Sequence, residues 1–369
     1  MRVARSLRLA TSLLVAVSGG AIAQNAIPDG DWRTINRDAG ATRFSPLKEI
    51  NKGNVAQLTE AWTYPFRSFN TAVPLVIDGT MYFPAGSRIV ALDADTGQEK
   101  WVYTLPAPAA PAAPAAGGSA PPAPTASGRG VSYWPGDSAT PARILVMVGN
   151  KMLALDAASG QPSAGFGQGG MIDVGIAYGR TPTIAEDVAI IGAATLENQP
   201  GDPGNTRAFD VRTGRKLWEF SSVAQPGTPG NETWGNGWKG RSGTNMWGPA
   251  APVDLKRGIV IIPLGSPAPN YWGGERPGAN LFGNSLVALD YKTGAYKWHF
   301  QTVHHDLWDI DQATSGALLE VGGHPVIASS NKRSLFFVID RETGKPYLPV
   351  EERPVPAGDV PGEYYSPTQ

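Results

Sequence analysis

The stretch Ala91-Leu92-Asp93-Ala94-Asp95-Thr96-Gly97, followed by Trp101, decides the fold because the chain repeats it four more times. The later copies begin at Ala154, Ala208, Ala288 and Val338, and each ends in Gly. Each copy follows an apolar, β-branched run, which together with the Ala-x-Asp residues forms one strand. The Asp accepts hydrogen bonds from turn amides and the Gly takes positive φ, so the chain turns back into a second strand. The pattern therefore predicts a series of β-hairpins.

The spacing of the copies indicates propeller blades. A blade of four short strands takes roughly 40 to 50 residues. The copies lie 50 to 80 residues apart, so we expect insertions between the strands. Trp101, Trp218 and Trp298 place a large ring on the strand after the turn, where it packs between sheets, whereas the second copy has no closing Trp. Trp62 is expected on an outer strand without a turn of its own. Five copies of so long a pattern favour an all-β propeller of four-stranded antiparallel blades over unrelated hairpins.

Composition and the N-terminus restrict the function and the location. The formal net charge of −1 does not favour nucleic acid or an acidic membrane as a partner, and the absence of Cys excludes disulfides, thiolate metal sites and covalent haem attachment. Residues 1–23 form the predicted signal peptide, with basic Arg2, Arg5 and Arg8, a short apolar run and an Ala-x-Ala cleavage site. We expect a soluble, exported, periplasmic protein without a transmembrane segment. Residues 24–369 form the expected propeller domain, and its Pro- and Ala-rich stretch 106–128 is expected to be a disordered loop.

A polar stretch stands apart from the repeats. Residues 302–311 read Thr-Val-His-His-Asp-Leu-Trp-Asp-Ile-Asp and hold two of the four histidines in the protein. His304 and His305 are a poor chelating pair, since neighbouring side chains of an extended chain point in opposite directions. An Asp beside an apolar indole loses solvation, which raises its pKa and makes it a stronger base. Metal ligation, proton abstraction and the capping of a strand end all remain open on these residues alone.

The repeat A-x-D-x-x-T-G-x-x-x-W together with the H-D-x-W-D element, His305 to Asp309, resembles the pyrroloquinoline quinone (PQQ)-dependent dehydrogenases. The His-His-Asp-Leu-Trp-Asp form is most similar to the membrane glucose dehydrogenase branch. The resemblance runs from about Asp31 to Gln369 and implies an eight-bladed propeller, of which about five blades are present. It also implies an enzyme that oxidises an alcohol or a sugar, with PQQ and calcium as cofactors.

The resemblance also implies roles for particular residues. Asp309 matches the family's catalytic base, which lies at the calcium ion, and Glu197 matches a calcium ligand. Arg129 falls on the arginine that binds the acidic cofactor, a role suited to a forked guanidinium. Trp247 falls on the Trp under the quinone ring, with Met246 as the alternative. Lys332 matches the basic residue near the quinone oxygens.

Some positions differ from the family pattern. Arg333 is the alternative to Lys332. The expected Asn ligand of calcium aligns with Ser266, and Asn270 is the other candidate. Thr71 stands where the family has a Glu near the first blade. The family's adjacent Cys pair is missing because the chain has no Cys, so a different residue must cover one face of the quinone.

The rival functions belong to another class. A non-catalytic periplasmic propeller scaffold would use the same repeats without a cofactor, and an inactive, C-terminally truncated fragment of the enzyme is the third alternative. The set Arg129, Glu197, Trp247, Asp309 and Lys332 favours the enzyme, since a scaffold has no need of it. No haem-binding Cys-x-x-Cys-His is present. We therefore expect the electrons to leave to a separate acceptor, a cytochrome or a membrane quinone.

Overall fold

The computed structural model describes residues 27–66, 71–107 and 123–369. The predicted signal peptide at 1–23 and most of the predicted loop at 106–128 lie outside these ranges. Two short 3-10 helices, Val55–Gln57 (η1) and Asn231–Trp234 (η2), occur in the described part. No helix among the described residues is long and apolar enough to span a membrane. Almost all of the regular structure is therefore β-strand, as the sequence predicted.

The strands follow the repeats along the chain. They are Leu75–Ile77 (β1), Thr80–Ala85 (β2), Arg88–Asp93 (β3), Glu99–Thr104 (β4), Ser132–Trp134 (β5), Arg143–Val148 (β6), Lys151–Asp156 (β7), Met171–Asp173 (β8), Thr183–Ala185 (β9), Val188–Ile191 (β10), Thr206–Asp210 (β11), Lys216–Phe220 (β12), Val253–Asp254 (β13), Ile259–Pro263 (β14), Ser285–Asp290 (β15), Tyr296–Gln301 (β16), Ala317–Val321 (β17), His324–Ser330 (β18) and Phe336–Asp340 (β19).

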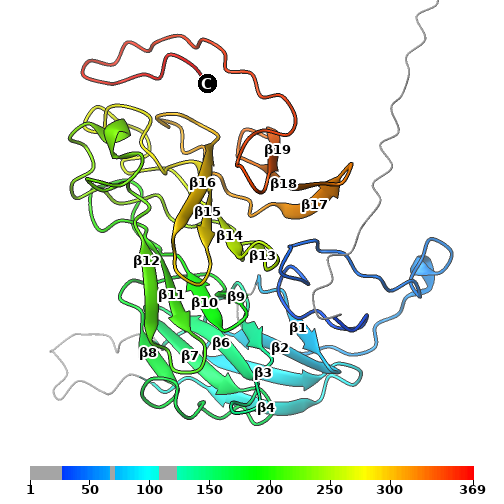
Figure 1. Cartoon of the computed structure of the whole chain (residues 1–369). Helices are drawn as coiled ribbons and strands as arrows, with labels where there is room; N and C mark the ends of the chain where they lie inside the picture. Colours follow the sequence, from blue (N-terminus) through cyan, green and yellow to red (C-terminus); the bar gives the residue numbers. More distant parts are fainter. Residues whose placement is uncertain (1–26, 67–70, 108–122) are drawn as a thin grey trace, which may run out of the picture.

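These strands form five antiparallel sheets, in which strands that are neighbours in the chain are also neighbours in the sheet. The first four sheets, β1–β4, β5–β8, β9–β12 and β13–β16, have four strands each, and β17–β19 has three. Figure 1 shows the sheets following one another around a common centre. In each of the four-stranded sheets the repeated turn lies between the third and fourth strands, and in the fourth sheet it sets Ala288 of β15 opposite Trp298 of β16. The prediction of four-stranded antiparallel propeller blades is confirmed.

The tryptophans that follow the repeated turns pack each sheet against the turn of the next sheet. Trp218 of β12 donates its indole N–H to the carbonyl of Tyr291, at 2.9 Å, in the turn of the following sheet. Its ring lies so close to Gly294 of that turn that a Cβ there would come within 2.7 Å of the indole. Trp62, Trp101 and Trp298 make the same two contacts with the turns at 93–97, 156–160 and 340–344. Trp62 does this from a segment that is not a strand, in contrast to our expectation.

The junction of the second and third sheets lacks a Trp and uses two other side chains. Arg143, which is buried, donates to the carbonyls of Val211, at 2.8 Å, and of Arg212 in the third turn. Ile172 takes the place of the indole ring against Gly214. A guanidinium thus supplies the hydrogen-bond donor and an aliphatic side chain supplies the apolar contact. The two sheets are therefore joined in the same way without an aromatic residue.

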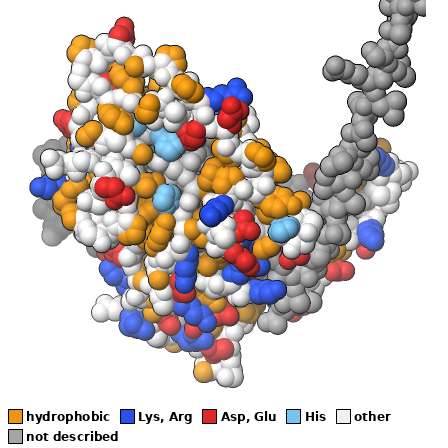
Figure 2. All heavy atoms as spheres, turned by 45° about the horizontal axis from the view of Figure 1, so that its top comes forward, with side chains coloured by type: hydrophobic (Ala, Val, Ile, Leu, Met, Phe, Trp, Pro, Cys, Tyr) orange, Lys and Arg blue, Asp and Glu red, His pale blue; other side chains and the backbone are white. Residues whose placement is uncertain are grey.

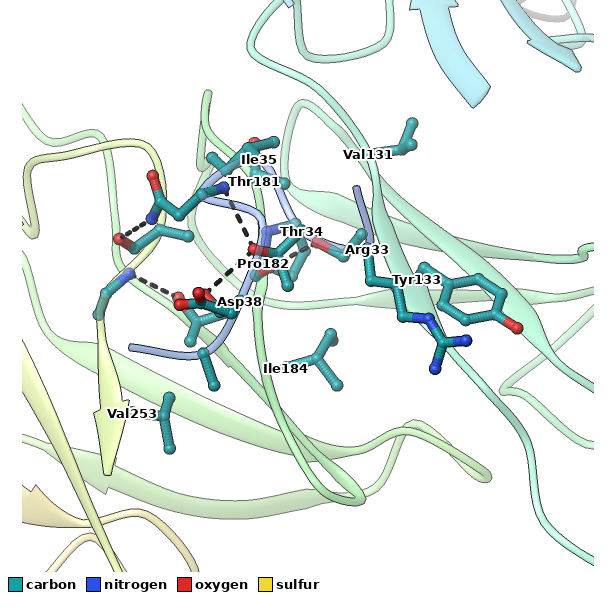
Figure 3. A pocket seen from close by; sticks show the side chains of 16 residues that line it. Arg33, Thr34, Ile35, Asp38, Val131, Tyr133, Thr181, Pro182, Ile184 and Val253 are labelled. Carbon is teal, nitrogen blue, oxygen red and sulfur yellow. Dashed lines mark hydrogen bonds between the residues drawn. The ribbon is translucent and has the colours of Figure 1, made fainter. Parts of the chain in front are cut away.

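The N-terminal segment enters the centre of the sheets. Residues 33–39 pack against the first strands β5, β9 and β13 and leave a small cavity of about 30 Å³ (Figure 3). Asn36 donates to the carbonyl of Ala250 at 3.2 Å, which ties this segment to the connection before β13. The segment therefore contacts the first strands of three sheets.

The antiparallel order decides where the functional loops lie. In a four-stranded meander, the connection between the second and third strands and the connection to the next sheet lie at the same end. The repeated turns lie at the opposite end. The long connections 221–252, 264–284 and 302–316 therefore extend from one end, where Figure 1 shows them beneath the C-terminal segment.

Candidate functional site

All five site residues predicted from the sequence lie on connections at this one end. Arg129 precedes β5, Glu197 follows β10, Trp247 precedes β13, Asp309 precedes β17, and Lys332 follows β18. Residues next to strands of four different sheets can meet only because the meander brings these connections to one end.

Three carboxylates converge at the centre of this site. One oxygen from each of Glu197, Asp309 and Asp311 lies within 4.8 Å of the others. Asp311 is fully buried, and its Oδ1 accepts the backbone N–H of Ser266 at 2.7 Å. The Oδ1 atom of Asp309 is buried and has no hydrogen-bond partner among the described residues. The cluster thus contains a buried carboxylate oxygen that accepts no hydrogen bond from the described residues.

Lys332 is the cation that faces this cluster. Its Nζ atom lies 2.9 Å from Oδ2 of Asp309 and 2.6 Å from Oδ2 of Asp311. Partial burial works against the charge of Lys332, but the hydrogen bonds to the two Asp carboxylates outweigh it and raise its pKa. Lys332 therefore stays protonated and holds both carboxylates in place.

Burial and mutual repulsion act on the acids. Burial raises the pKa of Glu197, and the charges of Asp311 and Asp309 raise it further, while hydrogen bonds from Asn245 and Trp247 oppose the shift. Burial also raises the pKa of Asp311, against the hydrogen bond to Lys332. Three carboxylates share the one ammonium group of Lys332, and the Arg180 guanidinium interacts electrostatically with Glu197 and Asp311. Lys332 alone therefore leaves negative charge on the cluster uncompensated.

A cavity of about 280 Å³ opens beside the acids. Its lining includes Glu197, Asn245, Arg129 and Arg180. The indole of Trp247 forms a flat wall, with the Arg180 guanidinium 4.1 Å from its ring centre. Its N–H donates to Oε1 of Glu197 at 3.2 Å. The cavity thus combines a flat aromatic surface, two guanidinium groups and a carboxylate.

Glycine at position 265 allows two of these groups to approach each other. A Cβ atom there would lie 2.5 Å from the ring of Trp247 and 2.6 Å from Oδ1 of Asp311. Any side chain at this position would push the indole away from the acids.

The structure also places the alternative residues that the sequence offered. Met246 is buried in the apolar core, so Trp247 is the residue that lines the cavity. Arg333 is exposed, whereas Lys332 contacts the acids.

The positions that differ from the family pattern also have defined contacts. The Ser266 hydroxyl donates to Asp306. Asn270 is buried with a free amide oxygen, and its N–H donates to the carbonyl of Glu197 at 2.9 Å. Thr71 bonds to the carbonyl of Gly128, next to Arg129.

Sequence reasoning missed three residues of this site. Asp311 lies two positions after Asp309, and that spacing was the available signal. Arg180 and Asn245 gave no signal of their own, since an Arg or Asn in a Gly-rich loop is common on protein surfaces. Asn245 holds Glu197 through a 2.9 Å hydrogen bond, and its amide oxygen also accepts the backbone N–H of Thr195.

Comparisons with known proteins identify the family of the chain. The family model for the "PQQ: Glucose/ethanol/alcohol dehydrogenase, beta-propeller domain" matches residues 32–369. The quinoprotein glucose dehydrogenase of Escherichia coli K12 is 32% identical over 386 residues, which cover 93% of this chain and 46% of that protein. The glycerol dehydrogenase large subunit of Gluconobacter oxydans is 32% identical, over 94% of this chain and 50% of that protein. The chain thus spans about half the length of these relatives.

The solved structures point to the same fold. The quinohemoprotein alcohol dehydrogenase from Comamonas testosteroni superposes with a TM-score of 0.69 at 28% identity, over 87% of this chain and 49% of that one. A europium-containing methanol dehydrogenase gives a TM-score of 0.71 at 24% identity, which bears on the fold alone. Since the family model covers nearly the whole described chain, this protein belongs to the β-propeller family of the PQQ-dependent glucose, ethanol and alcohol dehydrogenases.

Proposed function

We propose that this protein is the cofactor-binding part of a periplasmic, PQQ-dependent dehydrogenase that oxidises an alcohol or a sugar. One observation carries the proposal: Glu197, Asp309 and Asp311 meet Lys332 beside a cavity that has an indole wall and two arginines. A propeller that served only as a scaffold would have no need to bring these charges together.

The acid cluster fits a calcium ion. Calcium prefers hard oxygen ligands, and carboxylates of Glu and Asp are the commonest among them. The three carboxylates lie close enough to share one ion, and Asp309 Oδ1 has no other partner among the described residues. Glu197, Asp309 and Asp311 would hold the ion, which would balance the charge that Lys332 leaves uncompensated.

The cavity fits a flat, acidic cofactor. Trp247 offers its face to a planar ring, for which stacking gives the largest contact area. Arg129 and Arg180 can each bind a carboxylate through two hydrogen bonds. Its volume of about 280 Å³ is near the lower limit of small-molecule sites, roughly 300 Å³. Arg129, Arg180, Trp247 and Lys332 would therefore hold PQQ.

Asp309 is placed to act as the base. When bound, PQQ would accept a hydride from the substrate carbon, with calcium as the Lewis acid at its carbonyl. Oδ2 of Asp309 is held by Lys332 at 2.9 Å, whereas Oδ1 is free to accept the proton of the substrate hydroxyl. Lys332 remains protonated and stabilises the negative charge that develops nearby.

The proposal includes the location and a partner. Residues 1–23 act as a cleaved export signal, and N-terminal sequencing of the mature protein should begin at Gln24; a chain that keeps residues 1–23 would contradict export. Electrons leave to a separate cytochrome or membrane quinone, because a chain without Cys carries no covalently bound haem. Oxidation of a screened alcohol or sugar should accordingly require an added electron acceptor.

The decisive experiment is a titration of the purified protein with PQQ, with and without calcium, followed by cofactor absorbance and Trp fluorescence. We expect saturable binding that requires calcium and quenches the fluorescence, because Trp247 stacks on the ring. Trp247→Phe should still bind but lose most of the quenching. A folded protein that binds neither PQQ nor calcium would refute the proposal and favour the scaffold or an inactive fragment.

A further inference from the structure

Asp306 lies three residues before Asp309 and is completely buried, yet it is outside the group of carboxylates that can share a metal ion. Its Oδ1 accepts the backbone N–H of Trp308 at 3.0 Å. Its Oδ2 accepts the backbone N–H of Ile310 at 2.6 Å and the side-chain amide of Asn284 at 2.8 Å. The Ser266 hydroxyl also donates to Oδ2. Both oxygens are thus fully used inside the protein.

These bonds fix the conformation of the loop that carries the site acids. The two backbone donors, at 308 and 310, alternate with the two acids, Asp309 and Asp311. The loop contains two residues with positive φ, His305 at 46° and Asp309 at 58°. This conformation costs energy for residues other than Gly and persists where surrounding contacts impose it. Asp306 provides such contacts on both sides of Asp309.

The same carboxylate ties this loop to the connection between β14 and β15. Asn284 from that connection bonds both Asp306 and the carbonyl of Ile310, at 2.9 Å. Ser266 bonds Asp306 through its hydroxyl and Asp311 through its backbone N–H. Arg276, also buried, donates to the carbonyl of Asp306 at 2.6 Å. Two loops from neighbouring sheets are therefore held together around one buried carboxylate.

We infer that Asp306 is a positioning residue that sets the geometry of Asp309 and Asp311 toward Glu197 and thereby the affinity of the cation site. The inference rests on the proposed function, since the cation site is part of that proposal. It also gives Ser266 a role: its hydroxyl supports Asp306, and the carboxylate of Asp311 supplies the additional oxygen at the site.

The test compares three variants by calcium titration calorimetry and by thermal unfolding. Asp306→Asn keeps the shape of the side chain but turns an amide NH₂ toward donors that need an acceptor. We expect its calcium affinity to fall at least 10-fold. Ser266→Ala removes one donor of four and should weaken binding about threefold. Asp290→Asn is the matched control, because Asp290 likewise accepts two backbone N–H groups and a hydroxyl, but in a turn at the other end of the sheet.

The outcomes separate positioning from general stability. The inference holds if Asp290→Asn lowers the melting temperature with unchanged calcium affinity while Asp306→Asn loses affinity. It is overturned if Asp306→Asn binds calcium like the wild type. If Asp306→Asn does not fold, unchanged affinity in Ser266→Ala overturns it. If the wild type itself binds no calcium, the proposed function fails, and a crystal structure of Asp306→Asn decides the inference by whether the three carboxylates separate.

Discussion

Asp309 combines two properties that rarely occur together. Its backbone has a φ of 58°, and one of its carboxylate oxygens is buried without a partner among the described residues. Asp and Asn are the residues, after Gly, that tolerate this left-handed conformation best. The loop can therefore carry an acid at this point, next to Glu197 and Asp311.

Asp309→Asn should therefore remove the proposed base and keep the fold. Asn adopts the same φ, and its amide oxygen can still accept the hydrogen bond from Lys332. We expect kcat to fall by about 10²- to 10⁴-fold, the usual contribution of a general base. PQQ binding, followed by Trp fluorescence, should persist. Arg333→Met, a change at an exposed neighbour of Lys332, is the control and should keep wild-type kcat. An active Asn variant would remove Asp309 from the role of base.

The site could be predicted in part because its residues occur in recognisable local patterns. Asp309 lies in H-D-x-W-D, and the structure places its carboxylate near that of Glu197 and 2.9 Å from Lys332, while Trp247 donates to Glu197. The bonds of Asp306 and Ser266 could not be predicted, since they join loops 40 residues apart. Arg180 reaches the cavity through the order of the sheets, which no local pattern encodes.

At the scale of the element, the repeated turn has two functions. Its Asp accepts backbone and Thr hydrogen bonds within the turn, as Asp290 does from Thr293. Its Gly leaves room for a Trp from the preceding sheet. The sequence predicted the turn and the Trp but not their relation, because the Trp packs on the turn of the next sheet. It could likewise not be predicted that Arg143 and Ile172 together take the place of a Trp, since these residues lie far from each other in the chain.

This double function predicts unequal effects of two Gly→Ala changes in the same sheet. Gly258 and Gly294 have nearly equal φ, 70° and 74°, so alanine costs about 1 to 2 kcal/mol of backbone energy at either position. A Cβ at Gly258 meets nothing within 4 Å, whereas at Gly294 it would come within 2.7 Å of Trp218. Overpacking should add about 1 to 3 kcal/mol at Gly294. The free energy of unfolding of both variants is measured in urea. Equal losses of stability would show that the close contact between Gly294 and Trp218 does not make position 294 more sensitive than position 258.

At the scale of the molecule, the insertions that decorate the sheets bury polar groups above the propeller. His299 of β16 packs edge-on against Phe282 of the preceding connection, at 5.4 Å, and bonds to the Tyr296 hydroxyl at 2.8 Å. His305 is buried against Tyr364 of the C-terminal segment, at 4.7 Å. The repeats predicted that insertions exist, but not what they cover, because insertion sequences carry no periodic pattern. Figure 2 shows this face of the molecule, where apolar side chains, histidines and isolated charged groups are interspersed.

The buried histidines make the stability of the whole protein depend on pH. Burial lowers the pKa of His299, and the nearby charge of Glu232 opposes this only in part. Burial also lowers the pKa of His305, assisted by Arg276 and opposed by the Gly278 carbonyl and Glu363. The unfolded chain, with a His pKa of about 6.5, therefore takes up these protons at a higher pH than the folded protein does. Their contribution is fully present above pH 6.5 and is lost as the pH falls through the lower folded values.

We therefore expect the free energy of unfolding, measured in urea, to be lower at pH 5.5 than at pH 7.5, and His299→Gln to reduce this difference. The Gln amide can keep the bond to Tyr296 but has no proton to gain. Carboxylates titrate alike in both proteins, so the comparison isolates His299. His324→Gln, at an exposed position in β18, should keep the wild-type difference. The same pH dependence in His299→Gln and the wild type would mean that His299 gains its proton equally in the folded and unfolded chain, and burial would then not control its charge.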